Sequence, residues 1–277
     1  MNDYLHFLLW PFVACVVLVG IHVYFGLHII RRGIIFVDLS LAQIAALGMT
    51  TAFLFHQSPE SPTSYLFSLS FALLGALVFT LTRGIEGRIP QEAIIGIVYA
   101  VSSAAAILLV SHSPEGAEHI KFLLVGSILT VTPSIIIRTA IVYSIVGLFH
   151  YVTRRRFIAL SFGPGESHVG DLWWDFLFYA SFAVVVTSSV KICGVLLVFI
   201  FLVVPSVYAA LVTDSIGHRL VFGWLFGLIG AVLGLIASFV LDTPTGATIV
   251  CVFGLMLLVY AFWRMIAKNG RLGQVRT

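Results

Sequence analysis

Apolar residues fill most of the chain in blocks about 20 residues long, and short polar stretches separate the blocks. A helix needs about 20 apolar residues to cross the hydrocarbon layer of a membrane. The pattern therefore predicts an all-α transmembrane bundle of eight or nine spans in a single domain, 1–277. The expected spans are 4–30, 33–55, 64–82, 91–111, 132–151, 173–190, 192–212, 219–241 and 245–264. The stretch 122–131 is too short to cross, and we expect a re-entrant or interfacial helix there.

Composition supports a multi-pass membrane protein. Of 277 residues, 60% are hydrophobic and only 10% are charged, whereas soluble domains carry about 25% charged residues. Most of the apolar surface must therefore face lipid. The net charge of +3 is small and gives no indication of a nucleic-acid partner.

The distribution of positive charge predicts the orientation, because Lys and Arg collect on the cytoplasmic side of membrane proteins. Twelve of the fifteen Lys and Arg residues fall in alternate loops and in the C-terminal tail. The sequence therefore predicts an external N-terminus and a cytoplasmic C-terminus. The twelve are Arg31, Arg32, Arg83, Arg88, Arg154, Arg155, Arg156, Arg219, Arg264, Lys268, Arg271 and Arg276.

One expected span, 219–241, has small residues at four-residue spacing. They form two stripes, Gly223, Gly227, Ala231 and Gly230, Gly234, Ser238. Small residues let helix backbones approach closely in lipid. We expect a compact bundle, and the stripes would also suit a subunit interface.

Asp38, in "IIRRGIIFVDLSLAQIAALG", is a carboxylate within an expected span. Such residues are costly in lipid and usually face the bundle interior or an aqueous path. Asp38 is thus a candidate for the transport pathway; the alternative is a structural pair with Arg31, Arg32 or a helix N-terminus. Gln43 lies about 140° around the helix from Asp38. Gln43 and Ser40 are further pathway candidates, although interhelical hydrogen bonds explain the two side chains better.

Two histidines lie in the first span, and two external loops carry polar residues. His22 is a candidate metal ligand because neutral imidazole binds metals; the commoner alternative is a hydrogen bond to a nearby carbonyl. Glu118 and His119 could meet a cation or a partner at an external entrance, or belong to an ordinary loop. Asp242 is a third entrance candidate, and an N-cap of the last helix would also explain it.

The sequence contains no motif for covalent chemistry. HExxH, GxSxG and the phosphate-binding GxxxxGK[ST] are all absent. We therefore expect that the chain is not an enzyme and binds no cofactor. If ATP drives transport, another subunit must hydrolyse it.

The stretch 192–219 contains Pro205 near its middle. Proline removes a helix hydrogen bond and kinks the chain. We expect the helix to be interrupted there and a short second helix to follow along the cytoplasmic interface, where it could fit a groove on a soluble partner. The alternative is a plain kinked span followed by a loop.

Four stretches together resemble the ABC-3 type permeases, the membrane subunits of zinc, manganese and iron ABC transporters. They are "RRGIIFVDLSLAQIAALG", "QEAIIGIVYAVSSAAAILLV", "GVLLVFIFLVVPSVYAALV" and "LDTPTGATIV", and the likeness runs from about residue 17 to 264. The resemblance implies a bacterial inner-membrane homodimer, a cytoplasmic ATP-binding subunit and an external solute-binding protein. It also implies a coupling segment at about 206–218. The candidate contacts with the ATPase are Pro205, Ser206, Ala210, Asp214, His218 and Arg219.

The sequence departs from this family in its second helix. The family commonly has Gly-Asp-x-x-x-His there, with acid and imidazole on one face. In this chain either Gln43 or Ala42 occupies the position of the histidine, depending on the alignment. The cation would then be held differently, with Asp38 and His22 as candidates, or the cargo would not be a first-row metal.

The sequence thus favours the permease subunit of an ATP-driven importer, with a divalent metal as cargo. One alternative is a secondary transporter or channel that works without an ATPase, which internal inverted repeats would favour. Another is a structural membrane scaffold, in which no intramembrane polar residue would matter for function.

Overall fold

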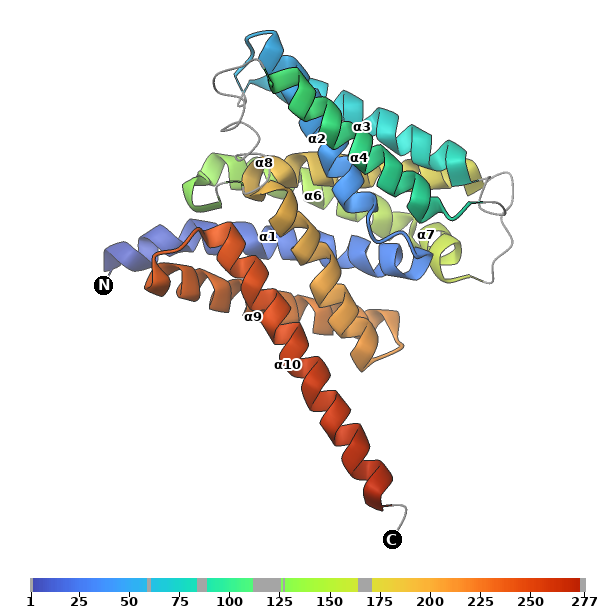
Figure 1. The fold of residues 1–277 in the computed structure, drawn as a ribbon, viewed down its shortest axis with the longest axis vertical. Coiled ribbons are helices and arrows are strands. Elements are labelled where there is room, and N and C mark those ends of the chain that lie inside the picture. Colours follow the sequence, from blue (N-terminus) through green and yellow to red (C-terminus); the bar gives the residue numbers. More distant parts are fainter. Residues whose placement is uncertain are drawn as a thin grey trace.

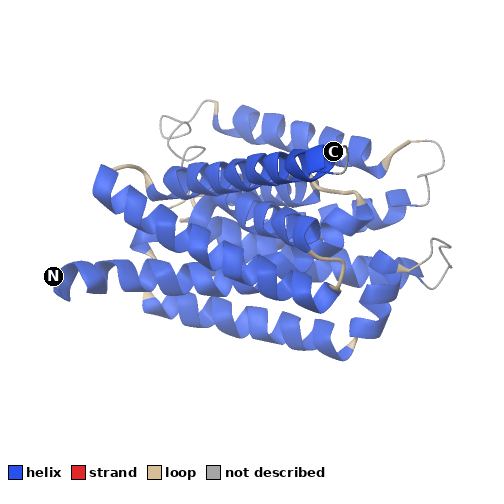
Figure 2. Ribbon diagram, turned by 90° about the horizontal axis from the view of Figure 1, so that it is seen from below, coloured by secondary structure: helices blue, strands red, loops and turns tan. Residues whose placement is uncertain are grey.

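The computed structural model describes residues 2–58, 61–83, 89–111, 126, 128–163 and 171–274, and within them the chain is helical with no strand. Figures 1 and 2 show the bundle from two directions. Its elements are α1 (Asn2–Arg32), α2 (Val37–Leu54), α3 (Pro62–Thr82), α4 (Gln91–Val110), the short 3-10 helix η2 (Ile128–Thr130), α6 (Pro133–Val152), α7 (Arg154–Phe162), α8 (Asp171–Val212), α9 (Ile216–Leu241) and α10 (Thr245–Gln274).

Eight of the described helices are long and apolar enough to cross a membrane. The predicted all-α, multi-pass fold is therefore confirmed. The expected spans 173–190 and 192–212 both lie in α8, whose 42 residues would extend about 63 Å if straight, roughly twice the hydrocarbon thickness. Figure 1 shows that α8 changes direction partway along its length.

The break in α8 lies at Gly194, with φ 75° and ψ 165°. That conformation is almost restricted to glycine and cannot continue a helix. The interruption expected at Pro205 is wrong: Pro205 lies inside the helix, which runs on to Val212. Membrane helices tolerate proline because the surrounding structure can compensate for the lost hydrogen bond. The expected separate short helix is absent from the described residues, since α9 begins at Ile216.

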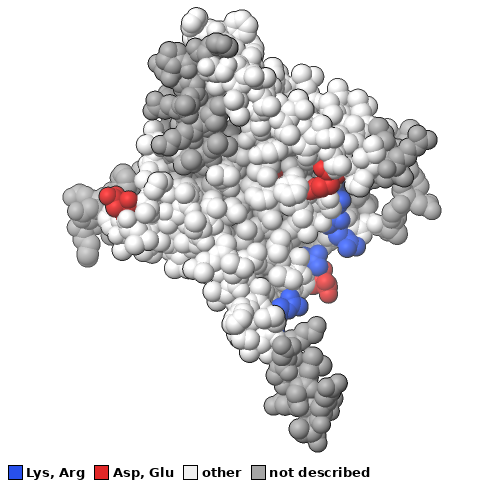
Figure 3. Space-filling model, viewed as in Figure 1, with Lys and Arg blue, Asp and Glu red and all other residues white. Residues whose placement is uncertain are grey.

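The connections gather at two opposite ends of the bundle. In Figure 1 the N-terminus and the α9–α10 turn lie at one end, whereas α7 and the α8–α9 turn lie at the other. Charged residues visible on this face gather mainly near the end that carries the α8–α9 turn, and a wide uncharged surface separates them from the opposite end (Figure 3). This distribution suits a bundle embedded in lipid. The orientation of its ends stays a prediction.

The small residues of α9 contact other helices of the same chain. A Cβ on Gly227 would lie 2.6 Å from a methyl group of Val19 on α1, and one on Gly230 would lie 2.6 Å from the ring of Phe253 on α10. These close approaches leave no room for a side chain. The expected compact packing is confirmed, and these two glycines serve it within a single chain.

Helices α1 and α2 are the most enclosed of the spans. The most apolar windows of α1 and α2 are 67% and 72% buried inside the protein, against 11% for α10. α2 packs against α3, α4 and α8, and α1 packs against α6, α7, α8 and α9. Polar groups on α1 and α2 are therefore removed from lipid.

Candidate functional site

Asp38 is fully buried in the first turn of α2. α1 ends at Arg32, a turn with Gly33 at φ 69° follows, and α2 begins at Val37. The backbone N–H of Phe36 donates to Glu92 Oε1 of α4 at 3.0 Å, which ties the start of α2 to α4. The fold thus holds Asp38 inside the bundle rather than at its surface.

Neither carboxylate oxygen of Asp38 has a hydrogen-bond partner within the part of the chain that the structure describes. The alternative expected from the sequence, a pair with Arg31, Arg32 or a helix N-terminus, is therefore wrong among these residues, and Arg32 instead pairs with Asp175. A buried carboxylate without a partner is expensive. Such a group indicates a place where a cation or water can be received.

Asp38 lies close to residues of two other helices. Tyr143 of α6 and Cys193 of α8 are both within electrostatic range of its carboxylate. Cys193 directly precedes the break at Gly194, and a Cβ on Gly126 would lie 2.2 Å from the Gly194 nitrogen. The unpaired acid therefore lies in the same region of the bundle as the interruption of α8.

His22 is also fully buried, on α1. Its Nδ1 lies 2.7 Å from the carbonyl oxygen of Leu18, and its Nε2 lies 3.1 Å from Ser189 Oγ on α8. The Ser189 hydroxyl in turn contacts the Tyr143 hydroxyl. The carbonyl contact expected as the commoner alternative is present. In addition, the rings of Tyr143 and His22 have their centroids 6.2 Å apart.

The remaining candidates on α2 are buried. Ser40 is fully enclosed, but its Oγ has no hydrogen-bond partner among the described residues, so the bond expected of it is absent there. Gln43 is 7% exposed.

The entrance candidates divide into two groups. Glu118 and His119 lie outside the described residues. Asp242 is exposed and forms the left-handed C-cap of α9, with φ 49° and ψ 50°. The N-cap role considered for Asp242 is therefore wrong: it ends α9, and the chain needs that turn to reach α10.

No group of three or more His, Cys, Asp and Glu residues comes together as a metal site in the described parts of the chain. Asp38 and His22 lie on different helices, α2 and α1. An ion held by these two side chains would need further oxygen donors from water or backbone. This arrangement suits passing cargo better than a permanent four-ligand site.

The candidate coupling residues fall into a buried part and an exposed part. Pro205 and Ser206 are buried in α8, where Ser206 Oγ donates to the Val23 carbonyl of α1 at 3.2 Å; Ala210 follows on the same helix. Asp214 and His218 are exposed at the α8–α9 turn. Of the candidate coupling residues, those at this turn are the ones accessible to another protein.

Arg219 stabilises the α8–α9 turn. Its Nε donates to the Thr213 carbonyl at 2.7 Å, and its Nη2 donates to Asp214 Oδ1 at 3.0 Å. The turn therefore keeps a defined shape and still presents exposed side chains at one end of the bundle.

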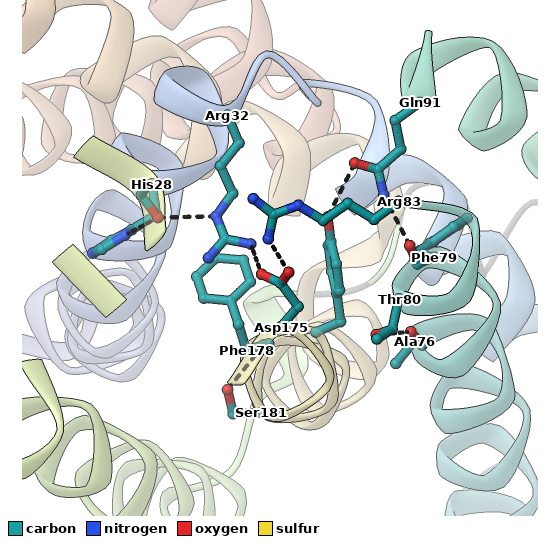
Figure 4. A network of polar contacts seen from close by, with 12 residues as sticks. His28, Arg32, Ala76, Phe79, Thr80, Arg83, Gln91, Asp175, Phe178 and Ser181 are labelled. Atoms are coloured by element: carbon teal, nitrogen blue, oxygen red, sulfur yellow. Dashed lines mark hydrogen bonds and ion pairs between the residues drawn. The ribbon is translucent and has the colours of Figure 1, made fainter. Parts of the chain in front are cut away.

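A second polar network, which was not predicted from the sequence, is shown in Figure 4. Asp175 of α8 accepts hydrogen bonds from Arg32 at the end of α1 and from Arg83 at the C-cap of α3. The Arg32 guanidinium also lies 4.0 Å from the centre of the Phe178 ring, a favourable cation–π geometry. Asp175 lies in the expected span 173–190, so the rule that identified Asp38 could have identified it as well.

Histidines extend this network towards α6 and α7. His28 Nδ1 lies 2.8 Å from Ser161 Oγ of α7, which also accepts from Arg32 Nε at 2.9 Å. His150 of α6 contacts the hydroxyls of Tyr24 and Ser181. These contacts fasten α1, α3, α6, α7 and α8 together near one end of the bundle.

Comparisons with known proteins agree with this architecture. A sequence model of the ABC 3 transport family matches residues 4–264. The manganese transport system membrane protein MntC of Listeria monocytogenes is 28% identical over 217 residues, which cover 73% of this chain and 75% of that protein. The chelated iron transport system membrane protein YfeC of Yersinia pestis is 28% identical over 196 residues, covering 69% of this chain and 65% of that protein.

A solved structure, PsaBC from Streptococcus pneumoniae in complex with a Fab, has the same fold. Its matching chain superimposes with a TM-score of 0.74 at 21% identity, and the match covers 93% of both chains. The fold is thus shared over nearly the whole length at low sequence identity.

Proposed function

The chain belongs to the ABC 3 transport family, and from this premise we propose that it is the permease subunit of an ATP-driven importer of a divalent metal ion. The eight apolar helices make it a multi-pass membrane protein. We place it in the bacterial inner membrane, with its N-terminus outside and its C-terminus in the cytoplasm.

The observation that carries the proposal is the unpaired carboxylate of Asp38. It is fully buried, and both of its oxygens are without a hydrogen-bond partner among the described residues. A passing cation would compensate its charge, with His22 Nε2 as a second donor. We propose manganese or ferrous iron as cargo, because oxygen and imidazole donors suit these ions and the named relatives transport manganese or chelated iron.

The proposal assigns a partner to each end of the bundle. A cytoplasmic ATP-binding subunit would contact the α8–α9 turn, where Asp214 and His218 are exposed and Arg219 fixes the shape. A second copy of the chain would complete the pathway, and an external solute-binding protein would deliver the ion at the opposite end. The family assignment supports this arrangement over a secondary transporter.

The test is to co-express the chain with the ATP-binding subunit, reconstitute the complex in lipid vesicles and measure ATP hydrolysis with and without Mn²⁺. We expect stimulation in the wild type. We expect Asp38→Asn to abolish it while the ATPase still co-purifies, and the control Ser144→Ala, whose exposed hydroxyl donates to the Ala140 carbonyl of its own helix, to keep it. Full stimulation of Asp38→Asn would refute the role of Asp38, and ion uptake without ATP would favour the secondary transporter.

A further inference from the structure

We propose that Ser189 and Tyr143 form a hydroxyl pair that caps the metal-binding nitrogen of His22 until an ion arrives. The inference rests on the proposed function, in which His22 is a ligand of the transported ion. It adds that a hydrogen bond blocks Nε2 of His22 while no ion is bound. Rotation of one hydroxyl group removes this bond.

The hydrogen-bond directions follow from the chemistry of the groups. The Leu18 carbonyl can only accept, so His22 Nδ1, 2.7 Å away, must carry the N–H. A neutral imidazole has a single N–H, which leaves a lone pair on Nε2. The Ser189 hydroxyl, 3.1 Å from Nε2, is placed to donate to it; the same hydroxyl also donates to the Val185 carbonyl at 2.7 Å, so these two acceptors share its one proton. His22 therefore has the tautomer that metal ligands require, with the other nitrogen oriented by a backbone carbonyl.

Tyr143 completes the cap. Since the one proton of Ser189 is shared between His22 and the Val185 carbonyl, the Tyr143 hydroxyl donates to Ser189 Oγ. Accepting this bond makes the Ser189 hydroxyl a better donor. His22 and Ser189 are fully buried and Tyr143 is 5% exposed, so water does not readily replace these contacts. Tyr143 also lies within electrostatic range of Asp38, which places the cap beside the proposed pathway.

The cap can open without leaving a buried hydroxyl unsatisfied. Ser189 Oγ lies 2.7 Å from the Val185 carbonyl on its own helix. Rotation of the Ser189 O–H from His22 to Val185 exchanges one acceptor for another. The lone pair of His22 Nε2 is then free for an ion, and Tyr143 can still donate to Ser189. An entering cation competes with a single hydrogen bond.

The test measures Mn²⁺ affinity of the purified permease–ATPase complex by competition with a fluorescent chelator. Ser189→Ala removes the cap, so we expect the affinity to rise about fivefold, the usual net value of one hydrogen bond. Tyr143→Phe keeps the ring and should raise the affinity about twofold. The matched control is Ser188→Ala, whose hydroxyl contacts Val184 and Tyr65 instead, and we expect no change.

The double variant His22→Ala/Ser189→Ala should bind Mn²⁺ as His22→Ala alone does. An increase in affinity is hard to obtain by damaging a structure, so it separates a cap from a merely structural role. Unchanged affinity in both Ser189→Ala and Tyr143→Phe would overturn the cap, and weaker binding in Ser189→Ala would make Ser189 a ligand instead.

Other outcomes of these measurements test the proposed function independently of the cap. If Asp38→Asn and His22→Ala both weaken Mn²⁺ binding while Ser189→Ala does not strengthen it, only the cap is wrong. If neither Asp38→Asn nor His22→Ala changes binding, the proposed ion site itself is wrong.

Discussion

Arg32 and Asp175, 143 positions apart in the chain, are joined by a hydrogen bond of 2.9 Å between Nη1 and Oδ1. Their side chains are only 5% and 1% exposed. Arg83 donates to the other carboxylate oxygen. One carboxylate therefore connects the end of α1, the end of α3 and the beginning of α8 (Figure 4), and this connection fixes the helices around α2.

Asp175→Asn should destabilise the protein by about 3 kcal/mol, because it leaves two largely buried guanidinium groups without their counter-charge. The measurement is the thermal unfolding midpoint in detergent. Asp214→Asn is the matched control: it also removes an Arg–Asp pair, but the Asp214 side chain is fully exposed, and exposed pairs contribute little. A wild-type midpoint for Asp175→Asn would show that the pair does not hold the bundle together.

The sequence predicted the spans because lipid demands long apolar helices, whatever their neighbours. The sequence could not predict which charged residues form ion pairs with one another. The sequence offers Asp38 as a nearby partner of Arg32, whereas the actual partner, Asp175, lies in a different helix far along the chain. For Asp38, burial was predictable, but the absence of a hydrogen-bond partner among the described residues depends on tertiary packing.

The boundary between the expected spans 173–190 and 192–212 lies at Lys191, three residues before the break at Gly194. The sequence does not indicate that Gly194, rather than Pro205, interrupts the helix. Glycine is common in membrane helices, so Gly194 in "ICGVLL" carries no local signal, whereas Pro205 does. The conformation of Gly194 depends on its surroundings, including the backbone of Gly126, which packs directly against it. Proximity of these two residues cannot be read from one sequence.

Gly194→Ala should destabilise the protein by about 1–3 kcal/mol, because φ 75° with ψ 165° is almost closed to residues with a Cβ. Gly126→Ala should be at least as harmful, since its Cβ would lie 2.2 Å from two backbone atoms. The control is Gly147→Ala in α6, where a Cβ meets nothing within 4 Å. Thermal unfolding in detergent measures all three, and equal stability of Gly194→Ala and wild type would contradict the assigned backbone conformation.

Asp38→Asn should separate stability from function. An uncompensated buried carboxylate is costly, and a neutral amide of the same shape costs less. We therefore expect an unchanged or higher thermal midpoint together with lost metal transport. Uptake of radioactive Mn²⁺ into cells, normalised to the amount of protein in the membrane, measures the second quantity. A clear fall in the midpoint would mean that Asp38 is a structural pairing residue.

His218→Ala should weaken association with the ATP-binding subunit about tenfold, which corresponds to about 1.4 kcal/mol. His218 is exposed at the α8–α9 turn, and Arg219 holds the shape of that turn through the Thr213 carbonyl and Asp214, so the variant should fold normally. Thr243→Ala, at the α9–α10 turn on the opposite end of the bundle (Figure 1), should leave association unchanged. Co-purification at graded salt concentrations measures both. If Thr243→Ala releases the ATP-binding subunit and His218→Ala does not, this subunit binds at the other end of the bundle and the proposed orientation is reversed.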